Sequence, residues 1–261
     1  MRIMAKIRLS GVEKVFFSCR GEPHTALAEV DLEVTEGEFL CLLGTSGCGK
    51  STLLNLMGGF DTPTRGLISI DGETVKGPNP RFVTIFQDYG LFPWRNVLGN
   101  VEYGLEACGV NRKERQATAR IYLDLVGLAQ FERLHPHELS GGMKQRVAIA
   151  RALAVKPEVL FMDEPFGALD AITRIQMQQE ILRIWDMERA TMILVTHDID
   201  EAVYLGDRVV VMSQCGGSIR KVLPVPLPRP RDRTSSEFVN IRREILAEFF
   251  AEADRPFAYQ I

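Results

Sequence analysis

The order of hydrophobic and polar positions predicts strands of two kinds along this chain. Residues 3–9 and 30–34 alternate apolar with polar positions, which is typical of strands buried on one face. Residues 38–43 form a nearly continuous apolar run, as in a parallel strand buried on both faces. The remaining predicted strands cover residues 67–70, 159–162, 192–195 and 209–212, and we take the last of these as the final core strand.

Helical patterns separate these strands. A helix is predicted over residues 52–57, and a longer one over residues 172–186. Between about residues 88 and 155 the chain changes to helical character, with amphipathic spacing through residues 112–126 and again after Ser140. Because strands alternate with helices, the sequence predicts a mainly parallel sheet with helices packed against it.

Alternating prolines follow the last predicted strand. They are Pro224, Pro226, Pro228 and Pro230. Proline removes a backbone donor and restricts the residue before it, so this segment is predicted to be extended and not helical. A short helix is predicted afterwards, around residues 236–252.

Composition excludes several classes of protein. The 31 Lys and Arg residues against 34 Asp and Glu give a net charge of −3, so the basic footprint of a nucleic-acid binder is missing and no nucleic-acid partner is expected. No stretch approaches the roughly 20 apolar residues that span a bilayer, and the N-terminus lacks the apolar run of a secretory signal. The sequence therefore predicts a soluble, cytoplasmic protein that acts at a membrane only through a partner.

Cysteine usage fits that compartment. The five cysteines are scattered, with no C-x-x-C pair, so reduced thiols are expected; they are Cys19, Cys41, Cys48, Cys108 and Cys215. Cys48 lies inside a glycine-rich loop. We favour a small residue at a variable position over an oxidisable thiol there.

This glycine-rich loop follows the apolar run at residues 38–43 and predicts a nucleotide site. It has the sequence Gly44-Thr45-Ser46-Gly47-Cys48-Gly49-Lys50-Ser51-Thr52 and fits the pattern G-x-x-x-x-G-K-[ST] between a strand and a helix. Glycines let the backbone wrap closely around a phosphate with its N–H groups pointing inward, and the helix start adds its positive end. Lys50 is expected to reach the β- and γ-phosphates, and Ser51 to offer its hydroxyl to Mg²⁺.

Two carboxylates end a later apolar strand. Asp163 and Glu164 follow the apolar residues 159–162 directly. At a strand end, Asp163 is expected to hold the Mg²⁺ shell and Glu164 to orient or deprotonate an attacking water. An acidic strand end without function is the alternative for this pair alone, and the upstream phosphate loop makes it unnecessary.

A second anion site is predicted at a helix start far from the phosphate loop in sequence. Ser140 is a good N-cap, and Gly141 and Gly142 expose backbone N–H groups after it. The phosphate loop already serves the nucleotide of its own chain. We therefore expect these groups to meet the γ-phosphate bound by a second copy, so that two copies clamp the nucleotide. On spacing alone, a purely structural helix start remains the alternative.

Residues 139–146 resemble the signature sequence of the ABC ATPases, and the resemblance extends over nearly the whole chain. It implies that Gln87 is the Q-loop glutamine, which senses Mg²⁺ and faces the transport partner. Asp170 resembles the D-loop aspartate, which communicates across the dimer, and His197 the switch histidine that contacts the γ-phosphate. ATP and Mg²⁺ are the implied ligands.

The resemblance also implies an aromatic residue that stacks on adenine. Phe16 is the expected residue, and the adjacent Phe17 is left open as an alternative. Each motif residue taken alone could also be a structural residue without a role in the site, either a surface polar residue or a core aromatic. Their order along one chain favours the functional interpretation.

The fold implied is a P-loop NTPase (RecA-like) α/β core with a mainly parallel sheet, an N-terminal antiparallel β subdomain and a helical signature subdomain. We expect residues 1–220 to form the ATPase domain, with the helical subdomain at about 88–155. Residues 221–261 are expected to be a proline-rich extended segment and short helix of the same domain.

Two segments, residues 87–97 and 227–232, resemble the ATPases of nitrate, sulfonate and taurine importers, and residues 196–202 resemble those of importers generally. This resemblance implies a homodimer formed on ATP, at the cytoplasmic face of the inner membrane, under a permease fed by a periplasmic or lipid-anchored binding protein. An exporter ATPase or a non-transport ABC ATPase is the alternative. The solute touches the partners, so the sequence does not name it.

The segment Phe92-Pro93-Trp94 is the expected contact with the permease. A soluble monomer gains little by exposing such apolar residues. Trp94 is the preferred contact because the next positions, Arg95 and Asn96, are polar. Packing of all three residues into the helical subdomain is the alternative.

Overall fold

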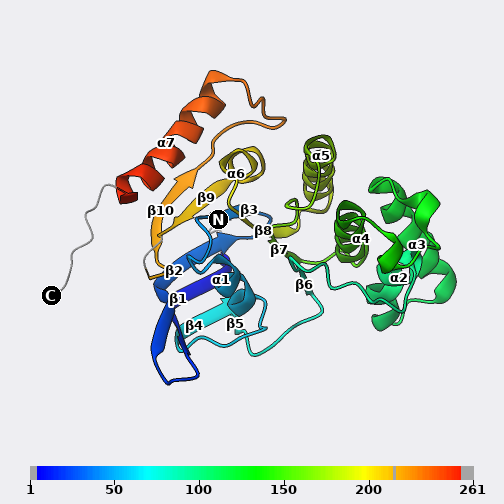
Figure 1. Ribbon diagram of the computed structural model, residues 1–261, viewed down its shortest axis with the longest axis horizontal. Coiled ribbons are helices and arrows are strands. Elements are labelled where there is room, and N and C mark those ends of the chain that lie inside the picture. The colour runs from blue at the N-terminus through cyan, green and yellow to red at the C-terminus, as the bar shows by residue number, and fades with distance from the viewer. Residues whose placement is uncertain (1–4, 214–215, 254–261) are drawn as a thin grey trace. The chain divides into compact units, whose positions relative to one another are not determined.

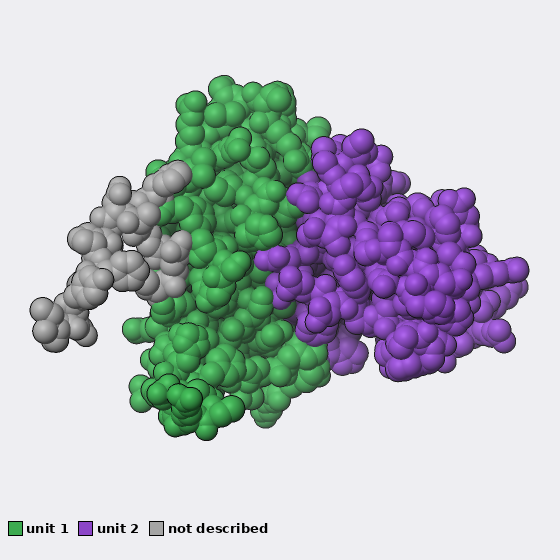
Figure 2. All heavy atoms as spheres, viewed as in Figure 1, with its two compact units in different colours: residues 1–78, 193–261 green, residues 79–192 purple. Residues whose placement is uncertain are grey.

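The chain folds into two units, shown in separate colours in Figure 2: residues 1–78 with 193–261 form unit 1, and residues 79–192 form unit 2. The structure is a computed structural model and describes residues 5–213 and 216–253 (Figure 1). Cys215, one of the five cysteines, lies outside the described residues.

Unit 1 contains an antiparallel sheet with the strand order β2-β1-β4-β5. Its strands are β1 (Ala5–Phe17), β2 (Pro23–Thr35), β4 (Arg65–Ile70) and β5 (Glu73–Thr74). In the second half of β2, Val30, Leu32 and Val34 are buried while the residues between them are exposed, which is the predicted alternation. β1 extends to Phe17, well past the predicted residues 3–9, because its pairing with β2 continues through several register shifts.

A second sheet has six strands in the order β10-β9-β3-β8-β7-β6. They are β3 (Phe39–Leu43), β6 (Phe82–Ile85), β7 (Val159–Asp163), β8 (Thr191–Thr196), β9 (Arg208–Met212) and β10 (Ile219–Pro224). β3 pairs with β9, and β6 with β7, in parallel, as expected for the predicted mainly parallel sheet, although β6 itself was not predicted as a strand. The chain passes from unit 2 to unit 1 within β8.

β10 is a strand that the sequence pattern did not predict. It follows residues 209–212, which we had taken as the final core strand, and pairs antiparallel with β9. Only Leu223 of its six residues is buried, so the strand has no apolar run by which to recognise it.

Unit 1 also contains the helices α1 (Lys50–Met57), α6 (Ile199–Leu205) and α7 (Ser236–Ala253). α1 ends at Gly58, and the apolar residues Leu53, Leu54 and Met57 form its buried face. The segment between β10 and α7 has no regular helix or strand, as the alternating prolines predict.

Unit 2 contains most of the helical region. Its helices are α2 (Val97–Ala107), α3 (Arg112–Leu125), α4 (Gly141–Ala154) and α5 (Ala171–Glu188), with short 3₁₀ turns at Ala129–Phe131 and Pro136–Glu138. α2, α3 and α4 pack against one another through buried residues such as Val101, Leu123 and Val147. Each of the four helices begins with a side-chain cap, from Asn96, Asn111, Ser140 or Asp170.

No helix within residues 5–213 and 216–253 combines the length and the apolar character needed to cross a bilayer.

Candidate functional site

The phosphate loop lies between β3 and α1, as predicted. β3 is fully buried, and the loop residues Ser46 and Gly47 that follow are exposed. Lys50 begins α1 with only 5% of its surface exposed. Its ammonium donates to the carbonyl oxygens of Gly44 at 2.9 Å and Thr45 at 2.8 Å. The loop therefore folds around the lysine head group and holds it in place.

Glycine is required at Gly49 for two reasons. Its φ of +96° lies in the left-handed region, which side chains other than glycine disfavour. A Cβ there would also lie 2.5 Å from the Ala26 carbonyl oxygen and 2.8 Å from Leu27 Cδ2. At Gly47, φ is +83° but nothing lies within 4 Å of a Cβ. The backbone is thus packed tightly at one glycine and left open at the other.

The helix start fits a phosphate ligand. Gly49 is the N-cap of α1, and among the described residues no side chain caps this helix end. The first N–H groups of a helix need partners from outside it, and an anion is the partner that the helix dipole favours. Helix α6 of the same unit gives a contrast, because the Asp198 side chain caps its start.

Cys48 is a buried member of the loop. It is 2% exposed, and burial raises the pKa of its thiol above the ordinary value. A Cβ on Gly44 would lie 2.5 Å from its sulfur, so the two positions are packed together. These features support a small packing residue over a reactive thiol.

In unit 2, the two carboxylates occupy the end of β7. Asp163 is the last strand residue and is 8% exposed, whereas Glu164 is partly exposed. Glu164 has a φ of +46°, a left-handed conformation that is uncommon outside glycine. Such backbone strain occurs often at functional sites, which fits a water-positioning carboxylate. Carboxylate oxygens such as those of Asp163, and hydroxyls such as that of Ser51, are the kind of ligand that Mg²⁺ prefers.

The signature segment begins α4 as predicted. Ser140 accepts a hydrogen bond from the Met143 amide at 3.3 Å. A Cβ on Gly142 would lie 3.4 Å from the Ala168 carbonyl oxygen, so the residues just before Asp170 pack beside this helix start. Asp170 itself caps α5 by accepting from the Thr173 amide, an interaction that lowers the pKa of its carboxyl. The predicted signature and D-loop residues are therefore neighbours.

Gln87 is exposed in the segment that follows β6, and this segment is tied to the signature helix. A Cβ on Gly141 would lie 3.4 Å from the Tyr89 hydroxyl oxygen. Further along α4, Arg151 donates to the carbonyl oxygens of Tyr89 at 2.8 Å and Gly90 at 2.6 Å. Neither Tyr89 nor Arg151 was singled out from the sequence, because each contact joins segments far apart in the chain.

The next turn of this segment is held by Asn100, which is completely buried in α2. Its side chain accepts from the Phe92 amide at 2.8 Å and donates to the carbonyl oxygens of Phe92 and Arg95. An asparagine in the apolar face of a helix was the available signal for this role.

Of the two interpretations of this segment, Phe92 fits packing into the helical subdomain and Trp94 fits an exposed contact. The Phe92 ring packs on Tyr103 with ring centres 4.5 Å apart. Trp94 is 72% exposed, and its ring centre lies 5.4 Å from that of Phe92. Beside them lies an apolar pocket of about 330 Å³, whose lining includes Phe86, Phe92, Tyr103 and Arg151.

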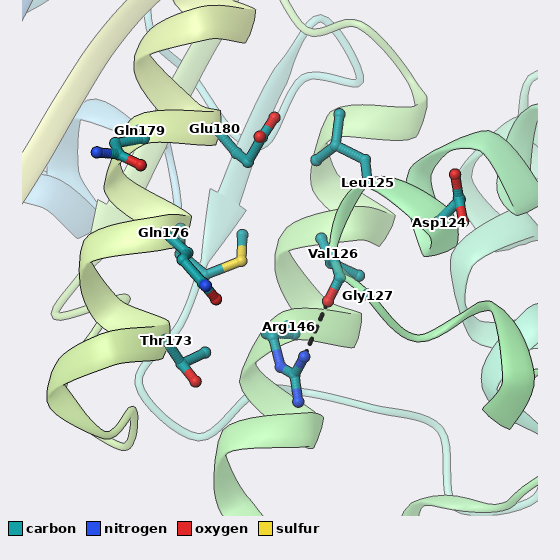
Figure 3. Close-up of a pocket in the computed structure, with 10 residues that line it drawn as sticks. Asp124, Leu125, Val126, Gly127, Arg146, Thr173, Gln176, Gln179 and Glu180 are labelled. Carbon is teal, nitrogen blue, oxygen red and sulfur yellow. Dashed lines mark hydrogen bonds between the residues drawn. The ribbon is translucent and has the colours of Figure 1, made fainter.

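A second pocket, of about 320 Å³, lies between α5, the signature helix α4 and the end of α3 (Figure 3). The end of α3, Arg146 of α4 and five residues of α5 line it, the latter being Thr173, Gln176, Met177, Gln179 and Glu180. Arg146 donates to the Val126 carbonyl oxygen at 3.0 Å, which joins the signature helix to the chain after α3. The lining includes charged residues of both signs: Arg146 of α4, Asp124 of α3 and Glu180 of α5.

In unit 1, His197 is exposed directly after β8. The residues around it are fixed by hydrogen bonds: Thr196 Oγ1 donates to Glu201 Oε2 at 2.8 Å, and Asp198 caps α6 by accepting from the Asp200 and Glu201 amides. Phe16 and Phe17 are also exposed, and the Lys14 ammonium lies 4.9 Å from the Phe16 ring centre. Both aromatics are accessible, so the choice between them stays a prediction.

The sequence matches known proteins over most of its length. Residues 27–167 match the family model described as ABC transporter. A nitrate import ATP-binding protein of Synechocystis sp. is 46% identical over 248 residues, which cover 95% of this chain and 92% of that protein. A bicarbonate transport ATP-binding protein of the same organism is 47% identical, and the match covers 88% of this chain and 82% of that protein. An uncharacterized ABC transporter ATP-binding protein of Methanocaldococcus jannaschii is 49% identical, and the match covers 94% of this chain and 91% of that protein.

Solved structures have the same fold. A dimeric post-hydrolysis state of the ATP-binding cassette MJ0796, bound to ADP and Pi, has a TM-score of 0.77 at 33% identity, and covers 85% of this chain and 100% of that chain. A second dimeric MJ0796 structure, of a bacterial ABC transporter cassette, has the same TM-score at 34% identity and the same coverage. The predicted fold class and the resemblance to importer ATPases are confirmed. The chain belongs to the ABC transporter family and is an ATP-hydrolysing transport ATPase.

Proposed function

We propose that this chain is the ATP-binding subunit of a bacterial importer and powers solute uptake through a membrane permease. It dimerises on ATP and works at the cytoplasmic face of the inner membrane, with a periplasmic or lipid-anchored binding protein delivering the solute. The solute is nitrate, a sulfonate, taurine or a related small solute. The names of the nitrate and bicarbonate relatives favour a small anion.

The phosphate loop holds the nucleotide together with residues before and after it in the chain. Residues 44–52 cradle the phosphates of ATP, and Phe16 stacks on adenine. Ser51, Gln87 and Asp163 hold Mg²⁺, which neutralises phosphate charge when bound. The capless start of α1 and the buried ammonium of Lys50 support this assignment.

The catalytic groups come from three other segments. Glu164 positions and deprotonates the attacking water, and His197 and Gln87 contact the γ-phosphate region. Ser140, Gly141 and Gly142 complete the site of a second copy, with Asp170 beside them. The dimers of MJ0796 support this two-copy arrangement. Residues 1–220 form the ATPase domain in this proposal, and residues 221–261 extend it.

The observation that carries the transport role is the apolar pocket beside the Gln87 segment. Phe86, Phe92 and Tyr103 line it, and Trp94 stands exposed next to Phe92. Arg151, which holds Tyr89 and Gly90, lines the same pocket. A cytoplasmic segment of the permease seated there would press on the residues that connect Gln87 to the signature helix.

The test replaces Trp94 with alanine. Tryptophan is enriched among interface hot spots, where truncation costs about 2 kcal/mol or more, so Trp94→Ala should bind the permease roughly thirtyfold more weakly. Its melting temperature and its ATPase activity without permease should stay near the wild-type values, because Trp94 is 72% exposed and outside the nucleotide site.

The matched control is Ile121→Ala, which removes another exposed apolar side chain of the same unit. It should leave permease co-purification and solute-stimulated hydrolysis unchanged in the reconstituted complex. A large fall in the melting temperature of Trp94→Ala with coupling intact would place Trp94 in the protein core and end the interface proposal.

A further inference from the structure

The tail after β10 contains two arginines that the proposed function does not use. Arg229 and Arg231 lie in the proline-containing segment at residues 227–232, which resembles importer ATPases in sequence. Arg231 is 7% exposed, so its charge is almost completely withdrawn from water. Burial, reinforced by the nearby charge of Arg229, lowers the pKa of Arg231 to about 10. A cation is buried only where other groups replace its water.

Backbone carbonyls at the end of α6 replace that water. Arg231 Nη1 donates to the carbonyl oxygens of Val203 at 2.7 Å, Tyr204 at 3.2 Å and Gly206 at 2.6 Å. Nη2 and Nε donate to the tail's own carbonyls, at Val225 and Leu227. One guanidinium thus joins the end of the helix to the returning tail.

The remaining carbonyls of the last turn of α6 are also bonded. Arg229 Nη2 donates to the Leu205 carbonyl oxygen, and the Gly206 amide donates to that of Ala202 at 3.0 Å. A helix normally leaves its last four carbonyls without partners inside the helix. In α6, two tail arginines and Gly206 cap all four, with positive charge at the negative end of the helix dipole.

Arg229 is also connected, through Asp207, to the strand that leads to the phosphate loop. Arg229 Nη1 donates to Asp207 Oδ1 at 2.6 Å. The other oxygen of Asp207 accepts from the Phe39 amide at 2.9 Å, and Phe39 begins β3. The tail therefore fixes the end of α6 against the base of the core sheet.

At its other end, α6 begins beside the switch histidine. Asp198 caps the helix, and Thr196 and Glu201 are hydrogen-bonded across His197. α7 packs on α6 as well, and Arg242 Nε of α7 lies 3.1 Å from Asp200 Oδ1 in the first turn of α6. One short, rigid helix joins the carbonyls that the arginines bind to the residues beside His197. A displacement of the capped end of α6 therefore also moves the end next to His197.

We propose that Arg231, assisted by Arg229, is a positioning residue for His197, acting through α6. This inference rests on the proposed role of His197. The tail then sets the rate of ATP hydrolysis without contacting the nucleotide. Lysine cannot replace Arg231, because one compact ammonium does not span the carbonyls that the planar guanidinium reaches.

The experiment measures Arg231→Lys in the full chain, alone and combined with His197→Ala. Single-turnover assays with labelled ATP give the hydrolysis rate even where it is slow, and equilibrium titration gives nucleotide affinity. Arg231→Lys should lower the hydrolysis rate roughly tenfold or more, because small misplacements of a catalytic group cost rates of this order. Nucleotide affinity should change by less than about twofold, since the phosphate loop is untouched.

In the His197→Ala background, Arg231→Lys should have no further effect on the hydrolysis rate, because residues that act through one another are not additive. The matched control is Arg220→Lys, which alters an arginine of β10 that pairs with Glu248 of α7. It should leave hydrolysis unchanged in both backgrounds. If Arg231→Lys fails to fold, Arg229→Lys takes its place in the same cycle, because one ammonium replaces the two nitrogens that bond Leu205 and Asp207.

Equal rate losses for Arg231→Lys with and without His197, or a lowered melting temperature with an unchanged rate, would overturn the inference and leave the role of His197 intact. Wild-type hydrolysis in His197→Ala alone would overturn the proposed role of His197, and the inference with it.

Discussion

Arg151 of the signature helix donates a hydrogen bond to the carbonyl oxygen of Tyr89 at 2.8 Å. This bond joins α4, which begins at the predicted γ-phosphate contact of Ser140, to the segment that starts at Gln87. Burial lowers the pKa of Arg151, in keeping with a cation held against carbonyl groups and away from water. A single side chain thus links the proposed permease pocket to the proposed dimer contact.

Replacing Arg151 with methionine should weaken this link. Arg151→Met keeps much of the apolar stem but loses the bonds to Tyr89 and Gly90. Solute-stimulated ATPase of the reconstituted complex should fall at least about fivefold, which corresponds to an ordinary coupling free energy of about 1 kcal/mol. Arg183→Met, on an exposed arginine of α5, is the control and should behave as wild type. Full stimulation in Arg151→Met would show that the signal takes another route.

Gly47 and Gly49 of the phosphate loop should respond differently to alanine. Gly47→Ala introduces only backbone strain, of order 1–3 kcal/mol, because no atom lies within 4 Å of the new Cβ. Gly49→Ala adds a collision with the Ala26 carbonyl and Leu27, so its loss in free energy of unfolding should clearly exceed that of Gly47→Ala. Urea unfolding of the two variants checks this order. Equal losses would mean that the loop relaxes freely around Gly49.

Alkylation with iodoacetamide should distinguish the cysteines. Cys19 and Cys108 are exposed, whereas Cys48 is buried with a raised pKa. A raised pKa leaves less thiolate at neutral pH, so Cys48 should react at least about tenfold more slowly than Cys19, and its rate should keep rising as the pH is raised. Peptide mass spectrometry at several pH values measures these rates. Reaction of Cys48 as fast as Cys19 at pH 7 would revive the oxidisable-thiol interpretation.

Features with local causes were predictable from the sequence. The apolar run of β3 ends directly at the glycine-rich loop, and the N-cap of α4 at Ser140 lies where the pattern placed it. In each case the residues that form the structure are within a few positions of one another. Capping and apolar periodicity depend on such short spacings.

Features with long-range causes were not predictable. Arg231 bonds carbonyls 25 and 28 residues earlier, and nothing in the proline-rich segment indicates which helix end it meets. β10 has a single buried residue and forms only because β9 offers it an edge. The pairing of β1 as far as Phe17 likewise depends on the returning strand β2. Tertiary contacts determine whether such elements form, and the local pattern of apolar and polar residues does not show which distant residues make contact.

The two-copy site is the central claim of this account, and the mass of the Glu164→Gln variant in solution with and without ATP tests it most directly. Losing the general base should slow hydrolysis about 10²–10⁴-fold while the phosphate cradle remains, so the ATP-bound dimer should accumulate. Glu237→Gln, on the exposed start of α7, is the matched control and should turn over ATP normally.

Adding Ser140→Arg to Glu164→Gln places a bulky cation at the signature helix start, where the partner's γ-phosphate should bind. Ser140→Ala in the same background removes the hydroxyl, and with it a helix cap worth about 1 kcal/mol and one proposed γ-phosphate contact, but adds no bulk or charge and keeps the N–H groups of Gly141 and Gly142. Light scattering should show a dimer with ATP for Glu164→Gln, a dimer for the Ser140→Ala double variant, and a monomer that still binds ATP for the Ser140→Arg double variant. An ATP-dependent dimer that persists with Ser140→Arg would contradict the account.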